Sequence, residues 1–420
     1  MKKVLIAKHI SLLISLFFTV LVSAQDVNYA RNILNELTSA KFHGRGYVKN
    51  GDAKAAKFIE KQFKNYKLNN FNGSYLQTYS FPINTFPGTI AVSIDNQELV
   101  PGEDYVISSS APSIDTEYEI HNLSQLGSNQ DSLIMAMHDI GGQGMYFIKE
   151  KNTRNNYGKT ITDVESVAIL TEKNPYWHVS NGGAVENTVW LKIKSTKVSD
   201  TAKKIKIKVK NKFIEDHQTQ NIIAYVEGSK YPDKYFVFTA HYDHLGMMGN
   251  STYYPGANDN ASGTSFVLDL ARHYSLPENK PEYSIVFILL SGEEAGLYGS
   301  KYFADNPLFP LEDIELLVNL DMVGSGSEGI TVVNATLYDV LFNKMLAINN
   351  ENQFLKEIKS RGESCNSDHC PFYQKGVKSI FIYTRGKELT EYHTVYDTSD
   401  NFPFTAYNGL FGLLTALVQN

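Results

Sequence analysis

The stretch YFVFTAHYDH, residues 235–244, decides the fold class of this chain. Residues 235–240 form an apolar run of strand length, and His241 follows at once. Three further apolar runs alternate with helix-like segments: runs at residues 284–290, 316–320 and 379–384, helices at 264–274, 295–304 and 406–418. Continuous apolar strands that alternate with helices indicate a sheet covered on both faces. We therefore predict an α/β fold, a three-layer sandwich around a mainly parallel mixed sheet.

The chain upstream of this stretch divides into two parts. Helical spacing of apolar residues predicts helices at residues 29–37 and from residue 52 onward. Residues 80–214 differ, because short β-rich pieces alternate there with polar, turn-prone stretches. We predict that residues 25–84 and 213–420 form one α/β domain, and that residues 85–212 form a β-rich domain inserted into it.

The first 24 residues have the three parts of a secretory signal peptide. Three lysines precede a largely apolar run at residues 10–22, and small residues end the segment at Ala24. A bilayer span takes about 20 residues, so a run of 13 favours export and cleavage over an anchor. We expect a periplasmic or extracellular protein without stable membrane insertion.

Composition and common motifs exclude several classes of function. The chain has 420 residues, of which 42% are hydrophobic, so it can bury a large core. The net charge of −6 argues against a nucleic-acid partner, which normally requires a basic surplus. The sequence contains no G-x-S-x-G or H-E-x-x-H motif. The sequence does not predict the oligomeric state.

Acids and histidines follow the predicted strands where each strand ends. They are His241 after the first strand, Glu293 and Glu294 after the second, Asp321 after the third and His393 beyond the fourth, with Asp259 in a loop that opens a helix. The five candidate metal ligands among them are 18, 35, 27 and 72 residues apart, so only the fold could bring them together. In such sheets ligands bind at the carboxyl ends of the strands.

Imidazole and carboxylate side chains in this number suit two borderline-hard cations such as zinc. A carboxylate can bridge the two ions, and Asp243 is close enough in sequence to orient the ring of His241. A two-metal site activates water near neutral pH, and it needs a neighbouring base to carry the proton. Of the adjacent acids Glu293 and Glu294, one can bind metal and the other can serve as that base.

These segments resemble peptidase family M28, zinc aminopeptidases with a phosphorylase/hydrolase-like α/β fold. The motifs correspond in order over residues 221–400, and the helical start at residues 28–68 is also similar. The resemblance implies that Asp259 bridges two zinc ions. His241 and Asp321 would complete one zinc site, and Glu294 and His393 the other.

The same resemblance implies roles for residues near the metal ligands. Glu293 would be the general base, and Tyr392 would donate a hydrogen bond to the developing oxyanion. The segment of Ser367, Asp368 and His369 is similar to a family loop beside the substrate pocket. The end of the insert, residues 189–193 and 204–210, resembles a protease-associated domain.

The two cysteines, Cys365 and Cys370, are five residues apart. In an exported protein they could form a disulfide that closes a tight loop. The alternative is a metal knuckle that includes His369, although this set lacks a fourth ligand.

We expect an exported aminopeptidase with two zinc ions that removes N-terminal residues from peptides. One alternative is a glutaminyl cyclase, which resembles this fold but uses a single zinc. A carboxypeptidase or dipeptidase on the same metal centre is another. A non-catalytic binding protein on this scaffold is the third, although such a protein would usually lack a ligand or the base, and both are present here.

Overall fold

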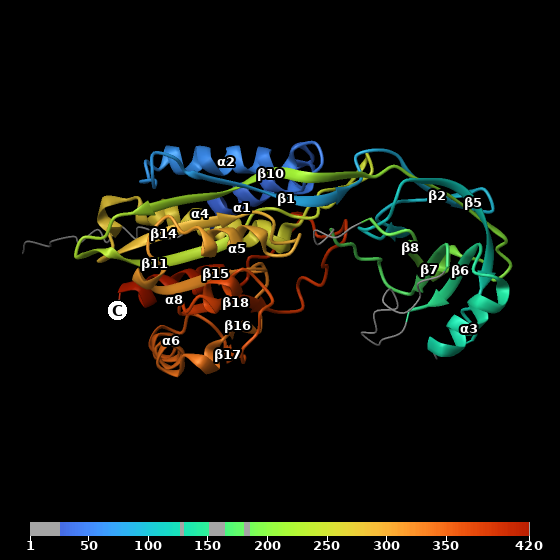
Figure 1. The fold of residues 1–420 in the computed structure, drawn as a ribbon. Helices are drawn as coiled ribbons and strands as arrows, with labels where there is room; N and C mark the ends of the chain where they lie inside the picture. The colour runs from blue at the N-terminus through green and yellow to red at the C-terminus, as the bar shows by residue number, and fades with distance from the viewer. Residues whose placement is uncertain (1–25, 127–129, 151–163, 180–184, 420) are drawn as a thin grey trace, which may run out of the picture.

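The computed structural model describes residues 26–126, 130–150, 164–179 and 185–419. The predicted signal segment, residues 1–24, lies outside these ranges. Within them, no helix is both long enough and apolar enough to cross a membrane. Figure 1 shows two lobes, one built around a long sheet with helices α1, α2, α4 and α8 and the other around a second, curved sheet with helix α3.

The first sheet contains eight strands in the described part of the chain. Their spatial order is β1 (Leu76–Thr85), β10 (Lys212–Val226), β14 (Tyr283–Leu290), β11 (Tyr231–His241), β15 (Ile314–Leu320), β18 (Ser379–Arg385), β16 (Gly329–Val333) and β17 (Ile358–Ser360). The four central strands, β14, β11, β15 and β18, are parallel to one another. Antiparallel pairs join β1 and β10 on one side and β16 on the other.

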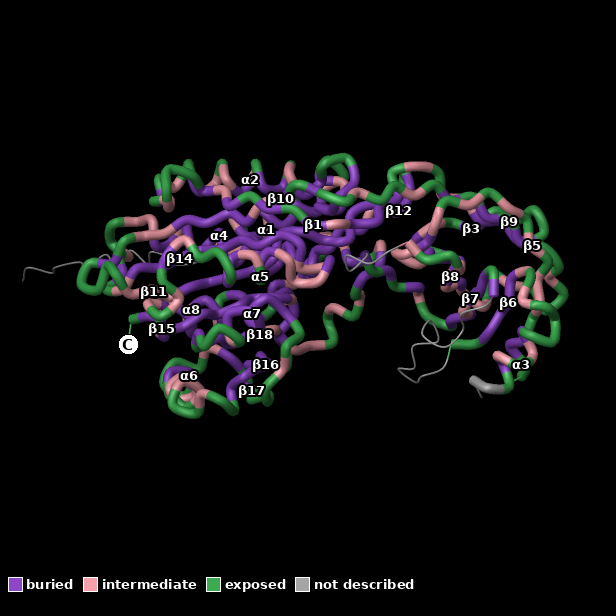
Figure 2. Tube along the Cα trace, viewed as in Figure 1, coloured by how far each residue is buried: buried purple, intermediate pink, exposed green. Residues whose placement is uncertain are grey.

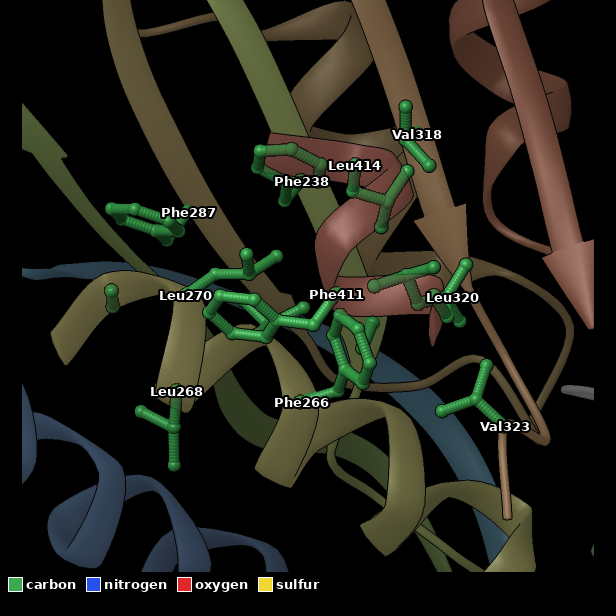
Figure 3. Packing of buried hydrophobic residues seen from close by; sticks show 14 of the residues in the cluster. Phe238, Phe266, Leu268, Leu270, Phe287, Val318, Leu320, Val323, Phe411 and Leu414 are labelled. Atoms are coloured by element: carbon green, nitrogen blue, oxygen red, sulfur yellow. The ribbon is translucent and has the colours of Figure 1, made fainter. Parts of the chain in front are cut away.

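Helices cover both faces of this sheet. They are α1 (Val27–Leu37), α2 (Gly51–Asn65), α4 (Ser262–Tyr274), α6 (Asp339–Asn352) and α8 (Tyr407–Gln419) on one face, and α5 (Tyr298–Asp305) and α7 (His369–Gln374) on the other. Figure 3 shows Phe266 and Leu270 of α4 with Phe411 and Leu414 of α8 close to Phe238 of the sheet. The predicted three-layer α/β fold is therefore confirmed.

Alternation along the strands explains why both faces are apolar. In β14, Ile285, Phe287 and Leu289 pack on the α4 side, whereas the residues between them pack against α5 and α7. A strand buried on both faces has no room for polar residues, and Figure 2 shows the central strands buried beneath exposed outer helix faces and loops.

The second sheet is inserted between β1 and β10. Within the described residues its order is β3 (Gln97–Leu99), β2 (Ile90–Ile94), β9 (Lys204–Val209), β5 (Ile114–Asn122), β6 (Met145–Lys149), β7 (Ser166–Thr171), β8 (Val189–Lys194) and β4 (Tyr105–Ile107). The β-rich prediction did not include its parallel part, β5 to β8, or helix α3 (Gln130–Ile140). Leu133 and Met137 of α3 are buried against Tyr146 of β6. We propose residues 85 and 212 as the domain boundaries, since β1 ends and β10 begins there.

Two local features bear on the site. The predicted helix at residues 295–304 begins only at Tyr298, because Gly292, Gly296 and Leu297 have positive φ and make the preceding residues a turn. Glu293 and Glu294 therefore lie on a loop. A disulfide joins Cys365, in the loop before α7, to Cys370 in the first turn of α7.

Phe238 provides a test of the core. It is buried in central strand β11, so Phe238→Ala should lower the free energy of unfolding by about 3–5 kcal/mol, through lost burial and the cavity left behind. The measurement is urea unfolding of the metal-free protein. The matched control is Val340→Ala on α6, which is 87% exposed and should change the free energy by less than about 0.5 kcal/mol. Equal effects from the two variants would contradict this assignment of the core.

Candidate metal centre

The carboxyl ends of the four parallel strands meet at one edge of the first sheet. β11 ends at His241, Asp321 directly follows β15, and the loop with Glu293 and Glu294 follows β14. His393 lies in the segment after β18, and Asp259 lies in the turn that precedes α4. The fold thus brings all the predicted strand-end residues to a common edge.

A first cluster forms around His241. Its Nε2 atom lies 3.3 Å from Asp259 Oδ1 and 3.4 Å from Asp321 Oδ1. Among the described residues, neither His241 Nε2 nor Asp321 Oδ1 has a hydrogen-bond partner, although both are buried. The three side chains offer ligand atoms that lie within 4.8 Å of one another, a spacing compatible with a single cation.

A second cluster forms around the other oxygen of Asp259. His393 Nε2 lies 3.0 Å from Asp259 Oδ2 and 3.1 Å from Glu294 Oε2. His244 adds a second imidazole, because its Nδ1 lies 2.6 Å from Glu294 Oε1. His244, Asp259 and Glu294 also offer atoms within 4.8 Å of one another. One carboxylate, that of Asp259, therefore belongs to both clusters.

The backbone around Asp259 is held from outside its own turn. The carboxylate of Asp397 accepts hydrogen bonds from the backbone N–H groups of Asn258 and Asp259, at 2.9–3.1 Å. At the start of α4, the side-chain Oδ1 of Asn260 accepts a hydrogen bond from the backbone N–H of Gly263. The side chain of Asp259 is thereby left to face the histidines.

Arg45 joins the two loops that carry the first cluster. Its guanidinium, fully buried, donates to the carbonyl oxygens of Tyr242 at 2.8 Å, Pro255 at 2.6 Å and Gly256 at 2.7 Å. Burial lowers the pKa of Arg45 to about 10, which still leaves it charged near neutral pH. The next residue must be glycine, because a Cβ on Gly46 would come within 2.5 Å of the Cα of Gly246.

Asp243 and Asp321 are fixed by further buried groups. Asp243 Oδ2 accepts a 2.6 Å hydrogen bond from Tyr47, and its Oδ1 accepts from the N–H of Glu293 at 3.3 Å. Asp243 Oδ1 is 3.7 Å from His241 Nδ1, and the nearer partner of that nitrogen is the Asp243 carbonyl, at 3.2 Å. Ser367 donates to Asp321 Oδ2 at 2.7 Å.

The adjacent glutamates have different electrostatic environments. Burial raises the pKa of Glu293 well above its usual value. Burial acts on Glu294 in the same direction, but the neighbouring imidazoles of His393 and His244 together outweigh it and lower the pKa of Glu294 to about 2. Burial would also raise the pKa of Asp259, yet the rings of His241 and His393 hold it well below the usual range.

The three remaining predicted residues lie around this centre in different environments. Tyr392 is 46% exposed and its ring stacks on that of His393, with the centroids 3.8 Å apart. Asp368 and His369 are fully buried. Asp368 accepts a 2.6 Å hydrogen bond from Ser300, and His369 Nε2 lies 2.8 Å from the carbonyl of Ser364. These last two side chains are buried and do not line an open surface.

The residues present fit zinc. Buried carboxylates and imidazoles at this density are costly unless a cation or a proton neutralises them. Two of the buried atoms that lack a hydrogen-bond partner among the described residues, His241 Nε2 and Asp321 Oδ1, point into the first cluster. Nitrogen and carboxylate oxygen donors are the ligands that zinc prefers.

Sequence reasoning missed several contributors. His178 was given no site role, and Arg45, Asp397 and Trp177 were not considered. The signals available were weak: a Gly-x-Gly turn around Arg45, and one acid four residues after His393. Contacts made across more than a hundred residues leave no local pattern, so only the fold identifies them.

Comparisons with known proteins agree with this fold. Residues 221–417 match the family model of Peptidase family M28. Aminopeptidase YwaD of Bacillus subtilis is 28% identical over 336 residues, 76% of this chain and 70% of that protein. A probable zinc metalloprotease of Leptosphaeria maculans is 38% identical over 109 residues, which are 26% of this chain and only 25% of that relative.

Two solved structures are similar over almost the whole chain. A zinc aminopeptidase from Bacillus subtilis superposes with a TM-score of 0.70 at 22% identity, covering 94% of each chain. A peptidase M28 precursor from Shewanella amazonensis SB2B gives 0.72 at 17% identity, covering 94% of this chain and 93% of that one. At these identities the likeness establishes the fold.

Arg45→Lys tests the clamp on the two loops. A lysine keeps the charge, but its single ammonium group cannot donate to all the separated carbonyls that the forked guanidinium of Arg45 reaches. Two buried carbonyls would lose their donor at about 1–3 kcal/mol each, so we expect the free energy of unfolding to fall by about 3 kcal/mol. Urea unfolding of the metal-free protein measures this loss.

The control for this variant is Arg361→Lys at an exposed position, which should stay within about 0.5 kcal/mol of the wild type. If Arg45→Lys were as stable as this control, Arg45 would not hold the loops.

Proposed function

We propose, on the match of residues 221–417 to the model of peptidase family M28, that this chain is a two-zinc aminopeptidase of that family and hydrolyses N-terminal residues from peptides. We also propose that it is exported, because residues 1–24 have the parts of a signal peptide. The inserted sheet is proposed to be a protease-associated domain, on the resemblance of its last strands.

One observation carries the proposal. The two carboxylate oxygens of Asp259 face different imidazoles, with Oδ1 3.3 Å from His241 Nε2 and Oδ2 3.0 Å from His393 Nε2. Each imidazole also has its own second acid, Asp321 for His241 and Glu294 for His393. A single shared carboxylate between two such pairs is the donor arrangement expected for two bridged ions.

In this proposal each zinc ion would have three protein ligands. Asp259 would be shared between the two ions, His241 and Asp321 would complete one site, and Glu294 and His393 would complete the other. Three protein ligands per ion would leave an open position at each, as catalytic zinc sites require. When bound, the pair supplies Lewis-acid activation of water and of the peptide carbonyl.

The chain's own residues would then orient the reactants and move the proton. Glu293 carries no ligand role, and its own backbone N–H donates to Asp243 Oδ1, which holds this part of the loop in place. Its carboxylate would accept a proton from water and deliver it to the leaving amine nitrogen. Tyr392, exposed beside His393, would donate a hydrogen bond from its hydroxyl to the developing oxyanion.

His244 and Ser367 would act on ligands and not on substrate. His244 donates to Glu294 Oε1, which turns the other oxygen of that carboxylate toward His393. Ser367 would orient Asp321 in the same way, because its hydroxyl donates to Oδ2 and leaves Oδ1 facing His241. Such outer hydrogen bonds orient ligands and tune metal affinity.

Metal removal tests the activity itself. The purified mature protein should hydrolyse aminoacyl-p-nitroanilides, lose this activity when chelated, and regain it on addition of two equivalents of zinc. A panel of aminoacyl groups would also rank the preference for the first residue.

Three outcomes would contradict the proposal. Cleavage of an N-acetylated peptide from its other end would indicate a carboxypeptidase. Release of ammonia from a peptide with N-terminal glutamine would indicate a cyclase. Inactivity of the zinc-loaded enzyme on the whole panel would indicate that the site has another use.

The adjacent glutamates provide a sharper test of mechanism. Glu293→Gln should lower kcat by about 10²- to 10⁴-fold, because a general base is lost, while both zinc ions remain bound. Glu294→Gln should instead lose zinc, because it removes a ligand. Elemental analysis of the purified variants and initial rates distinguish the two effects.

The control for both variants is Glu278→Gln, at an exposed position outside the site, which should change neither zinc content nor rate. A Glu293→Gln variant with wild-type turnover would remove Glu293 from the mechanism.

A further inference from the structure

The inserted domain reaches the proposed metal ligand His393 through residues 177 and 178. The N–H of Trp177 donates to the carbonyl of His393 at 2.9 Å. In return, His393 Nδ1 lies 3.0 Å from the carbonyl oxygen of Trp177. This reciprocal pair joins two segments that are 216 residues apart in the chain.

Trp177 is anchored to both domains. Its indole Nε1 donates to the carbonyl of Ile107, the last residue of β4 in the inserted sheet, at 2.9 Å. Its ring stacks on Tyr254, in the segment that leads to the Asp259 turn, with the centroids 5.1 Å apart. The side chain is only 4% exposed. The position of the Trp177 carbonyl is therefore fixed by packing on either side.

His178 adds a second acceptor to the same nitrogen. Its Nδ1 lies 3.0 Å from His393 Nδ1, and the two rings meet edge to face with their centroids 4.7 Å apart. His178 is exposed, so it lies between His393 and solvent.

These contacts define the tautomer of His393. A proton on Nδ1 is donated to the Trp177 carbonyl, which leaves the lone pair on Nε2. Nε2 is the atom that faces Asp259 and Glu294. A metal-binding histidine commonly donates its other ring N–H to a carbonyl or carboxylate, which fixes the ring and raises its basicity.

We propose that the inserted domain completes the metal centre, with Trp177 and His178 acting as positioning residues that hold His393 in its metal-binding tautomer and orientation. This inference rests on the proposed two-zinc function. It also means that deletion of residues 85–212 would remove part of the metal centre together with the insert, so the insert has to be tested by point substitution.

The test is the affinity of the full-length mature protein for each zinc ion, measured by competition with a chromophoric chelator. Trp177→Ala should lower the affinity for one of the two zinc ions by about 10- to 100-fold, the range for lost outer hydrogen bonds. The affinity for the other ion should stay nearly unchanged. Trp177→Phe keeps the ring against Tyr254 and should restore most of the affinity.

The matched control is Trp190→Ala. Trp190 is the other tryptophan of the chain, lies on β8 of the same sheet and packs with the α3 cluster. It should change neither zinc affinity by more than about 3-fold, because it is outside the ligand environment. A loss in this variant equal to that of Trp177→Ala would overturn the inference in favour of general destabilisation of the insert.

His178→Ala keeps the test decisive if Trp177→Ala does not fold, because an exposed side chain can be removed without opening the core. It should weaken the same ion as Trp177→Ala. Wild-type affinity for both ions in His178→Ala, and in Trp177→Ala where that variant folds, would overturn the inference, whatever the enzymatic activity.

Zinc binding separates this inference from the function it rests on. A wild-type protein that binds two zinc ions but hydrolyses no aminoacyl substrate would refute the aminopeptidase and leave the role of Trp177 standing. A wild-type protein that binds fewer than two ions would refute both.

Discussion

The carboxylate of Asp259 is the constraint on which the rest of the centre depends. Its two oxygens face two imidazoles that come from different segments, one at the end of β11 and one after β18, so an error in its position would disturb both clusters. Asp259 lies in a turn outside every strand of the sheet, and groups from other segments hold this turn in place. Asp397 accepts from its backbone N–H groups, and Arg45 donates to its carbonyls. Loop geometry at the edge of the sheet is therefore maintained by buried polar groups.

These polar groups are stable only because the surrounding layers exclude water. An unpaired buried carbonyl or carboxylate is costly, whereas a paired one rigidifies the structure around it. The three-layer packing supplies this environment, with apolar strands beneath the site and helices on both faces. The inserted domain also shields the site, since Trp177 packs on Tyr254 near the Asp259 turn. Core and insert thus serve the same function, which is to hold ligands from distant segments in fixed orientations.

Much of the fold and of the candidate site follows from sequence patterns. The apolar strands and the acids and histidines at their ends predicted the α/β sandwich, and the side chains that the family resemblance proposed as ligands are the ones that the structure brings together. Predictions were weaker where local signals conflict with long-range contacts. The helix at residues 295–304 begins late because positive-φ residues precede it. Parallel strands and helix α3 of the insert were missed, since short apolar runs in a polar context do not reveal their pairing.

The sequence by itself determined which residue types lie at the strand ends, because a strand buried on both faces must be apolar and its functional groups can only follow it. Only the tertiary structure decided how those groups are oriented. The Nδ1 partner of His393 is a backbone carbonyl of the insert, and the clamp on the Asp259 turn is an arginine more than 200 residues upstream. Backbone carbonyls carry no residue identity, so no pattern of side chains could have revealed these partners.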